Sequence, residues 1–251
     1  MPLLPRLLLP GCPLLAGTLM GYIQPIGFLC ACLFIALVLA PARLPQWLWC
    51  MLVMLASVLL AAHLLPGFRP WEIAQPQRIS ADAAPYQLRL SWDKLLVGCT
   101  LLAWWLGLPP RPLHRPAWIA PTFIITLLAV PGLAMLLGVV AWQPKWPGIL
   151  GAWLAINLVV AVLAEELLFR GLLQPHLIRW LGAWPGLLLT AALFGAVHMP
   201  FSPTFAAVAA VAGLGYGLVM QISGRLSLAI ALHGLVNLMH FTLLSYPLRI
   251  A

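Results

Sequence analysis

Long apolar runs, interrupted by few charges, limit the possible folds of this sequence more than any other feature. Hydrophobic residues make up 63% of the 251 residues and charged residues only 7%, whereas a soluble domain carries about 25% charged residues. Several runs approach the roughly 20 residues that a helix needs to cross a bilayer. We therefore predict an all-α, polytopic protein that is integral to a membrane.

The hydropathy pattern predicts about eight or nine transmembrane helices. The first two candidate spans are short and are separated by Gln24 and Pro25, so they form either one kinked helix or a re-entrant pair. The candidate spans are residues 7–23, 27–40, 46–65, 94–108, 119–142, 150–170, 184–200, 203–222 and 226–247. Tryptophans near the span ends predict an interfacial belt: Trp47, Trp71, Trp92, Trp118, Trp142, Trp146, Trp180 and Trp184.

One sizeable polar segment, residues 66–93, separates the early spans, and its alternating YQLRLSW stretch predicts a short hairpin or strand. We expect two parts: N-terminal membrane helices over residues 1–149, which include this polar loop, and a C-terminal helical core over 150–247. The net charge is +8, but the basic residues lie mainly between apolar runs, as in membrane proteins. Nucleic acid is therefore not an expected partner, whereas the lipid bilayer is.

Two adjacent glutamates, Glu165 and Glu166, lie inside the apolar span 150–170, although the chain has only five acidic residues. A carboxylate at membrane depth costs roughly 2.5–3.5 kcal/mol, so we expect at least one of the two to be functional. Glu166 and Arg170 are four residues apart, which predicts an ion pair on one helix face. Glu165 points about 100° away round the helix and has no such partner there.

Two further polar motifs interrupt later spans. Phe194 and His198 belong to the FGAVH motif, and the HGLVN motif places His233 and Asn237 on one helical stripe, with His240 one turn further along. A single membrane histidine is often only a satisfied interhelical hydrogen bond. Three polar motifs in neighbouring spans are each other's most available partners, so we expect them to converge inside the bilayer.

A carboxylate, two histidines and an asparagine suit the hydrolysis of an amide bond. A glutamate and a histidine can activate a water as general base and acid, while a second histidine and an asparagine amide can stabilise the oxyanion. The last third of the chain has no cysteine, and neither GxSxG nor HExxH occurs. One carboxylate and two histidines could also bind Zn²⁺, but no recognisable zinc spacing occurs, so we favour a mechanism without metal or other cofactor.

The ordered motifs EExxxR, FxxxH and HxxxN resemble those of the CPBP family, intramembrane endopeptidases that include CAAX prenyl-protein proteases and the bacteriocin-processing and immunity-associated (Abi) proteins. The resemblance covers about residues 150–240 and implies an all-helical membrane core. It implies that Glu165 and His198 activate the water, and that His233 and Asn237 stabilise the oxyanion. The supporting residues are then Glu166, Arg170, Phe194 and His240; a zinc form would use Glu165, His198 and His233.

The favoured function is therefore an intramembrane endopeptidase that cleaves a peptide or a membrane-associated protein, in a bacterial inner membrane. A proton-coupled transporter is one alternative, because buried Glu and His chains relay protons in such proteins. A non-catalytic immunity or scaffold protein of the same fold is another. The sequence gives no oligomeric state. His240 lies about 10.5 Å along the helix from His233, too far for both to touch one carbonyl group, so its expected role is supporting.

Overall fold

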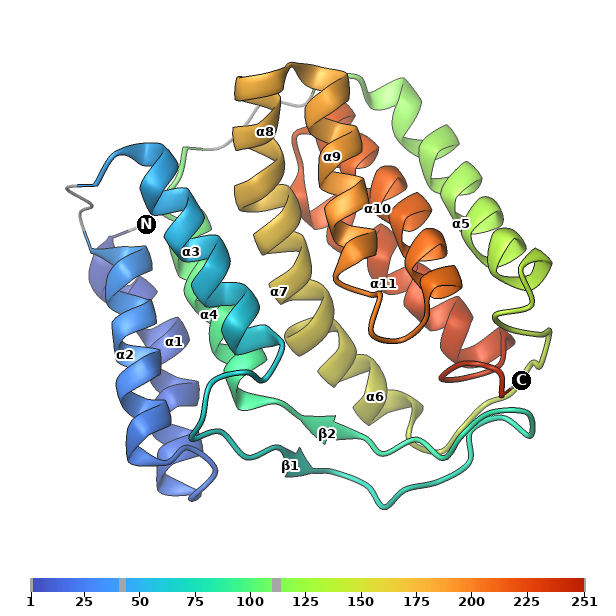
Figure 1. Ribbon diagram of the computed structural model, residues 1–251, viewed down its shortest axis with the longest axis horizontal. Coiled ribbons are helices and arrows are strands. Elements are labelled where there is room, and N and C mark those ends of the chain that lie inside the picture. The colour runs from blue at the N-terminus through green and yellow to red at the C-terminus, as the bar shows by residue number, and fades with distance from the viewer. Residues whose placement is uncertain (1, 41–43, 110–113, 251) are drawn as a thin grey trace. The chain divides into compact units, whose positions relative to one another are not determined.

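The computed structural model describes residues 2–40, 44–109 and 114–250 and is mostly helical, with one two-stranded sheet in these ranges (Figure 1). The chain divides into two compact units that alternate along the sequence. The first unit comprises Met1–Ile73, Arg89–Pro110 and Ile156–Leu173, and the second comprises Ala74–Leu88, Arg111–Ala155 and Gln174–Ala251. The division predicted from the sequence, between residues 1–149 and 150–247, concerns function rather than compactness, and it stays a prediction.

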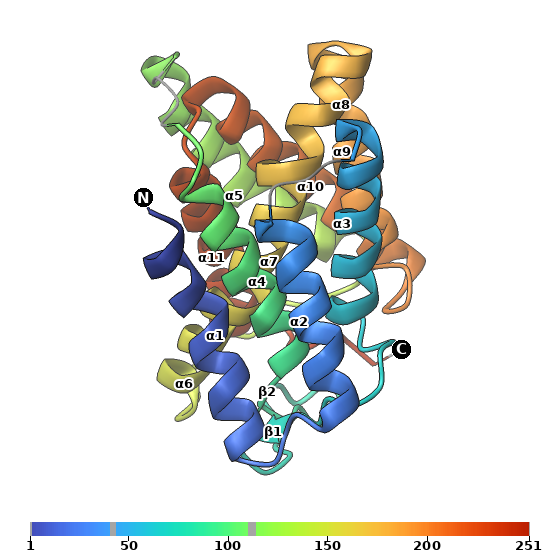
Figure 2. The ribbon, with the colours of Figure 1, turned by 90° about the vertical axis from the view of Figure 1, so that its left-hand side faces the viewer.

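The first unit is built around α4, which packs against α1, α2, α3 and α7 (Figure 2). Gly98 of α4 faces Ala164 of α7, where an added Cβ would make an ordinary contact of 3.4 Å with the Ala164 backbone nitrogen. The elements are α1 (Leu3–Leu19), α2 (Pro25–Leu39), α3 (Gln46–Ala61), β1 (Trp71–Glu72), β2 (Arg89–Leu90), α4 (Trp92–Trp105), the π-helix η2 (Asn157–Val162), α7 (Leu163–Glu166) and the π-helix η3 (Leu167–Leu173).

Three expectations for this part of the chain change. The first two spans are separate helices rather than one kinked helix, because Gly21 turns the backbone with a φ of 79° and Pro25 begins α2. The polar segment ends earlier than expected, since Trp92 already belongs to α4. Trp92 is 5% exposed and stacks on Tyr22, so its assignment to the interfacial belt is wrong. The predicted strand is confirmed by the pairing of β2 with β1.

The second unit is built around α10, which packs against α5, α9 and α11. Small residues allow these contacts: an added Cβ at Gly195 of α9 would lie 2.7 Å from the carbonyl oxygen of Ala206, and one at Gly215 of α10 would lie 2.4 Å from the hydroxyl of Thr126. The elements are the 3₁₀ helix η1 (Pro116–Trp118), α5 (Ile119–Leu136), α6 (Leu150–Ile156), α8 (Gln174–Leu181), α9 (Ala183–Ala196), α10 (Pro203–Ser223) and α11 (Leu226–Leu243).

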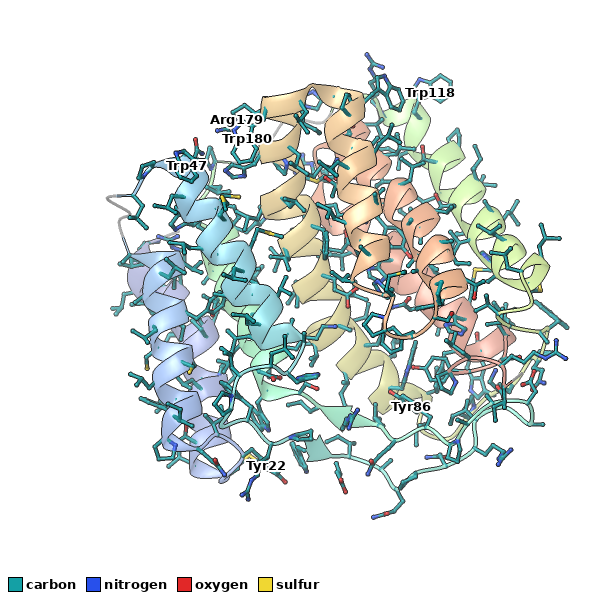
Figure 3. The ribbon with its side chains drawn as sticks, viewed as in Figure 1. Tyr22, Trp47, Tyr86, Trp118, Arg179 and Trp180 are labelled. Carbon is teal, nitrogen blue, oxygen red and sulfur yellow. The ribbon has the colours of Figure 1, made fainter. Side chains whose placement is uncertain are left out.

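Four helices in the described ranges are long and apolar enough to cross a membrane: Pro116–Leu136, Leu150–Leu181, Pro203–Ser223 and Leu226–Leu243. The third of the predicted C-terminal spans, 184–200, holds the shorter helix α9. The other tryptophans of the predicted belt, seven in number, are exposed. Within the second unit, Trp118 and Trp180 lie at one end of the helices and Tyr86 at the opposite end (Figure 3). These features define an integral membrane protein.

Candidate active site

A pocket in the second unit collects four of the residues that the sequence predicts. His198 reaches it from the turn after α9, while His233, Asn237 and His240 reach it from α11. Its remaining lining is mainly apolar and comes largely from α5, α9 and α10. Few polar groups converging in an apolar pocket are typical of a binding or catalytic site.

The sequence predicts a span that runs to residue 200 and includes His198. In the structure His198 instead lies beyond the end of α9. The helix ends at Ala196, and Pro200 disfavours helical geometry at the preceding residue. The Nδ1 atom of His198 lies 2.7 Å from the carbonyl oxygen of Phe194. A carbonyl oxygen only accepts hydrogen bonds, so Nδ1 carries the proton. In the neutral ring, Nε2 is then the nitrogen that can accept a proton.

Aromatic rings surround the His198 imidazole. The ring centroids of Phe194, Phe205 and Phe201 lie 4.9, 5.7 and 6.1 Å from that of His198. Ser202 fixes the start of α10, because its hydroxyl accepts a hydrogen bond from the Phe205 backbone N–H at 3.0 Å. The sequence motifs include Phe194 but give no indication of the other two rings.

His233 is held between two aromatic residues and is only 5% exposed. Its ring stacks on Tyr216 of α10, with centroids 4.5 Å apart and planes 15° apart. The Phe194 ring meets the His233 ring edge to face, with centroids 5.8 Å apart, so Phe194 lies against the imidazoles of both His198 and His233. The sequence analysis missed Tyr216. A tyrosine in the middle of an apolar span could have indicated it, since a buried hydroxyl needs a polar partner.

His240 is tied to the chain that follows α11. Its Nε2 donates to the carbonyl oxygen of Ser245 at 3.0 Å, and its ring lies 5.0 Å from that of Tyr246. The Ser245 hydroxyl in turn donates to Asp82 of the polar segment at 2.6 Å. Nearby, burial lowers the pKa of the Lys145 ammonium, an effect that the charge of Asp82 partly offsets. These contacts fasten the end of α11 to two loops of the same unit.

The two carboxylates of the first unit differ in their surroundings. Glu166 pairs with Arg170 at 2.8 Å, and both side chains are fully buried, which confirms the predicted ion pair. Glu165 pairs with Lys94 of α4 at 2.7 Å, a partner from a distant segment that the spacing along its own helix could not indicate. The Glu165 side chain nevertheless remains 18% exposed, whereas that of Glu166 is 0% exposed. Of the two carboxylates, Glu165 is therefore the one that a water can reach.

The backbone around these glutamates departs from a regular α-helix. Only the four residues of α7 separate the π-helical segments η2 and η3. π-Helical turns are rare and are frequently found at functional sites.

The predicted site residues are divided between the two compact units. The two carboxylates and Arg170 belong to the first unit, while the histidines and Asn237 belong to the second. In the described part of the chain, no group of three or more His, Cys, Asp or Glu side chains is placed to hold a metal ion.

Comparison with known families finds a match over the part of the chain that carries these polar residues. Residues 146–239 match the family model described as type II CAAX prenyl endopeptidase, Rce1-like. The match confirms the resemblance to the CPBP and CAAX protease family and spans all three motifs. Searches of curated proteins and of solved structures gave no match.

Proposed function

We propose that this protein is an intramembrane endopeptidase that cleaves a peptide bond in a peptide or membrane-associated protein. The observation that carries the proposal is the family match, because the matched segment contains every residue of the predicted catalytic set. The pocket supports it independently, since two histidines and an asparagine line one mainly apolar cavity. The bacterial inner membrane is the proposed location.

In the proposed reaction, Glu165 and His198 activate the water. The water oxygen bonds to the carbonyl carbon of the scissile peptide as its proton passes to this pair, and the proton then moves to the leaving nitrogen when the C–N bond breaks. The hydrogen bond from His198 Nδ1 to Phe194 supports this role, because it leaves Nε2 as the proton acceptor. The remaining exposure of Glu165 supports its access to water.

His233 and Asn237 are the proposed donors to the oxyanion. A donor is most effective when it is already oriented before the charge develops. The stacking of His233 on Tyr216 and its edge contact with Phe194 fix the plane of the imidazole. Asn237 follows one turn later on α11 and lines the same pocket, so its amide group can serve the same carbonyl oxygen.

The remaining polar residues have supporting roles in this proposal. The buried pair of Glu166 and Arg170 stabilises the π-helical segment that follows Glu165. Lys94 positions the Glu165 carboxylate through its hydrogen bond of 2.7 Å. His240 secures the end of α11, which carries His233, through its bond to Ser245.

A zinc form of the same enzyme would use Glu165, His198 and His233 as ligands. The geometry of His198 fits this form too, because metal-bound histidines usually donate their other ring N–H to a carbonyl or carboxylate. Bound zinc would polarise the scissile carbonyl and lower the pKa of the attacking water. We favour the form without metal, because the sequence lacks a recognisable zinc motif.

The test is cleavage by the purified protein in liposomes that contain a candidate membrane-associated peptide. Reaction in H₂¹⁸O should place one ¹⁸O atom in the new carboxyl group, as mass spectrometry of the products would reveal. Comparing a prenylated peptide with its unprenylated form would establish whether the lipid is recognised. Proton-coupled flux of a solute, with no cleavage of any peptide in a library of membrane-associated sequences, would instead favour a transporter.

A further inference from the structure

A second polar pocket lies in the first unit, where α3 leads into the polar segment and this segment leads into α4. His63, Arg69, Arg89, Ser91 and Asp93 contribute its polar lining. None of these residues belongs to the proposed catalytic set, and all of them lie outside the segment that matches the protease family. The pocket therefore has a chemistry that peptide hydrolysis does not explain.

His63 adopts an unusual backbone conformation in order to face this pocket. It is the one described non-glycine residue with a positive φ, 60°, at a position after a helix where glycine or asparagine is usual. Its Nδ1 lies 2.8 Å from Oδ2 of the buried Asp93, and its side chain remains 54% exposed. Oδ1 of Asp93 accepts the Lys94 backbone N–H at 2.8 Å. Both oxygens of the acid that lines the pocket are therefore already engaged.

The two arginines give the pocket its positive charge. Arg69 is fixed by its backbone N–H, which donates to the carbonyl oxygen of Tyr22 at 2.9 Å. Arg89 lies on β2 opposite Glu72 of β1, yet among the described residues neither arginine forms an ion pair. Arginine is well suited to phosphate, because its planar guanidinium can donate two parallel hydrogen bonds. The Gln24 amide oxygen accepts hydrogen bonds from Nε and Nη2 of Arg69 at 3.2 and 3.0 Å, which orients this guanidinium and leaves its Nη1 for a ligand. The positive charge of the two arginines thus favours an anion.

Aromatic residues beside the pocket are of the types that concentrate at the level of the lipid headgroups. Tyr22 stacks on the exposed Trp71, with ring centroids 6.0 Å apart, and on the buried Trp92 of the pocket lining, with centroids 5.9 Å apart, so Trp71 is the tryptophan that can meet the interface. Tryptophan and tyrosine concentrate at the membrane–water interface. The helices above carry large exposed apolar side chains, such as Leu15 and Leu33, which suit acyl chains. A phosphate that enters here would therefore be attached to a lipid.

We propose that this pocket binds the phosphate group of an anionic phospholipid, with Arg69 and Arg89 as the donors. A zwitterionic lipid fits less well, because Asp93, the acid in the pocket lining, is buried and already bonded and so is not available to a headgroup ammonium. Occupancy would anchor the α3–α4 end of the unit at the membrane surface. This inference does not depend on the proposed peptidase activity.

The test measures lipid binding to the purified full chain by native mass spectrometry, with no peptide substrate present. Phosphatidylglycerol should bind more tightly than phosphatidylcholine of the same acyl chains. Arg69→Gln and Arg89→Gln should each weaken phosphatidylglycerol binding about fivefold, since one arginine near an anionic lipid is worth about 1 kcal/mol. Arg89→Lys, which keeps the charge but loses the planar guanidinium, should bind less tightly than the unaltered protein and more tightly than Arg89→Gln. The matched control is Arg78→Gln, an exposed arginine of the same polar segment outside the pocket.

Two outcomes would overturn the proposal. Equal loss in the Arg78 and Arg89 variants would indicate diffuse attraction by the basic surface rather than a site. Equal binding of the two lipids would remove the preference for an anionic headgroup. Competition by millimolar inorganic phosphate, together with binding of free phosphate in the absence of lipid, would also contradict the proposal, because the ligand would then be a soluble anion.

Discussion

The buried ion pair between Glu166 and Arg170 gives the sharpest prediction of stability. Both side chains are fully buried and their charged atoms lie 2.8 Å apart. Replacing Arg170 by leucine leaves the Glu166 carboxylate in the core without its cation. Breaking a buried pair in this way costs about 3–5 kcal/mol, whereas an exposed pair is worth only about 0–1 kcal/mol. Because neither side chain is exposed, the cost for a buried pair applies here.

Thermal unfolding in detergent can be followed with a thiol-reactive dye, as the rise in signal from the buried Cys50 above the reaction of the exposed Cys12 in the same unit. Arg170→Leu should lower the unfolding midpoint by on the order of 10 °C, at about 2–4 °C for each kcal/mol. The matched control is Arg179→Leu, an exposed arginine further along the same continuous helix, which should shift the midpoint far less.

The double variant Glu166→Leu/Arg170→Leu separates charge from packing. It removes both charges together, so its cost should be well below the sum of the two single replacements. A double variant that loses the full sum, or an Arg170→Leu variant no less stable than the Arg179→Leu control, would refute the argument from burial.

The remaining predictions concern catalysis and packing. His233→Ala should lower kcat at least about 10²-fold, as for loss of an oxyanion donor, whereas His240→Ala should cost under about tenfold, mostly through stability; equal catalytic losses at unchanged stability would place His240 in the active site. Gly195→Ala should reduce both stability and activity, because its Cβ would lie 2.7 Å from a carbonyl oxygen of α10, while Gly132→Ala, with open space around it, should change neither. Elemental analysis of the active enzyme should find no stoichiometric zinc, and one zinc per chain that is lost together with activity on chelation would establish the zinc form.

Local features of the sequence predict much of the fold. Each of the nine apolar runs overlaps a helix of the structure, because hydropathy over about 20 residues reports directly on burial in lipid or core. The ion pair of Glu166 and Arg170 was also predictable, since their spacing on one helix fixes their proximity. Likewise, the spacing of His233 and Asn237 on α11 places both at one pocket.

Features that depend on packing between distant segments were not predictable. Lys94 and Glu165 are 71 residues apart, and their contact exists only because α4 packs against α7. The stacking of Tyr216 on His233 depends in the same way on the contact between α10 and α11. Hydropathy also overestimated the length of α9, because a hydropathy average takes no account of the backbone restriction that Pro200 places on the residue before it.

The most direct test of the proposed mechanism compares two variants that each remove one partner of the ion pair between Glu165 and Lys94. Glu165→Gln keeps the size of the side chain but removes the group that accepts the proton, and Lys94→Gln removes only the partner at 2.7 Å. If Glu165 is the base, Glu165→Gln should lower kcat for peptide cleavage at least about 10²-fold, with an unfolding midpoint similar to that of Lys94→Gln, which should remain substantially active. Small and equal losses in the two variants would show that Glu165 serves only the ion pair, and a well-folded but inactive Glu166→Gln variant would assign the base to the other glutamate.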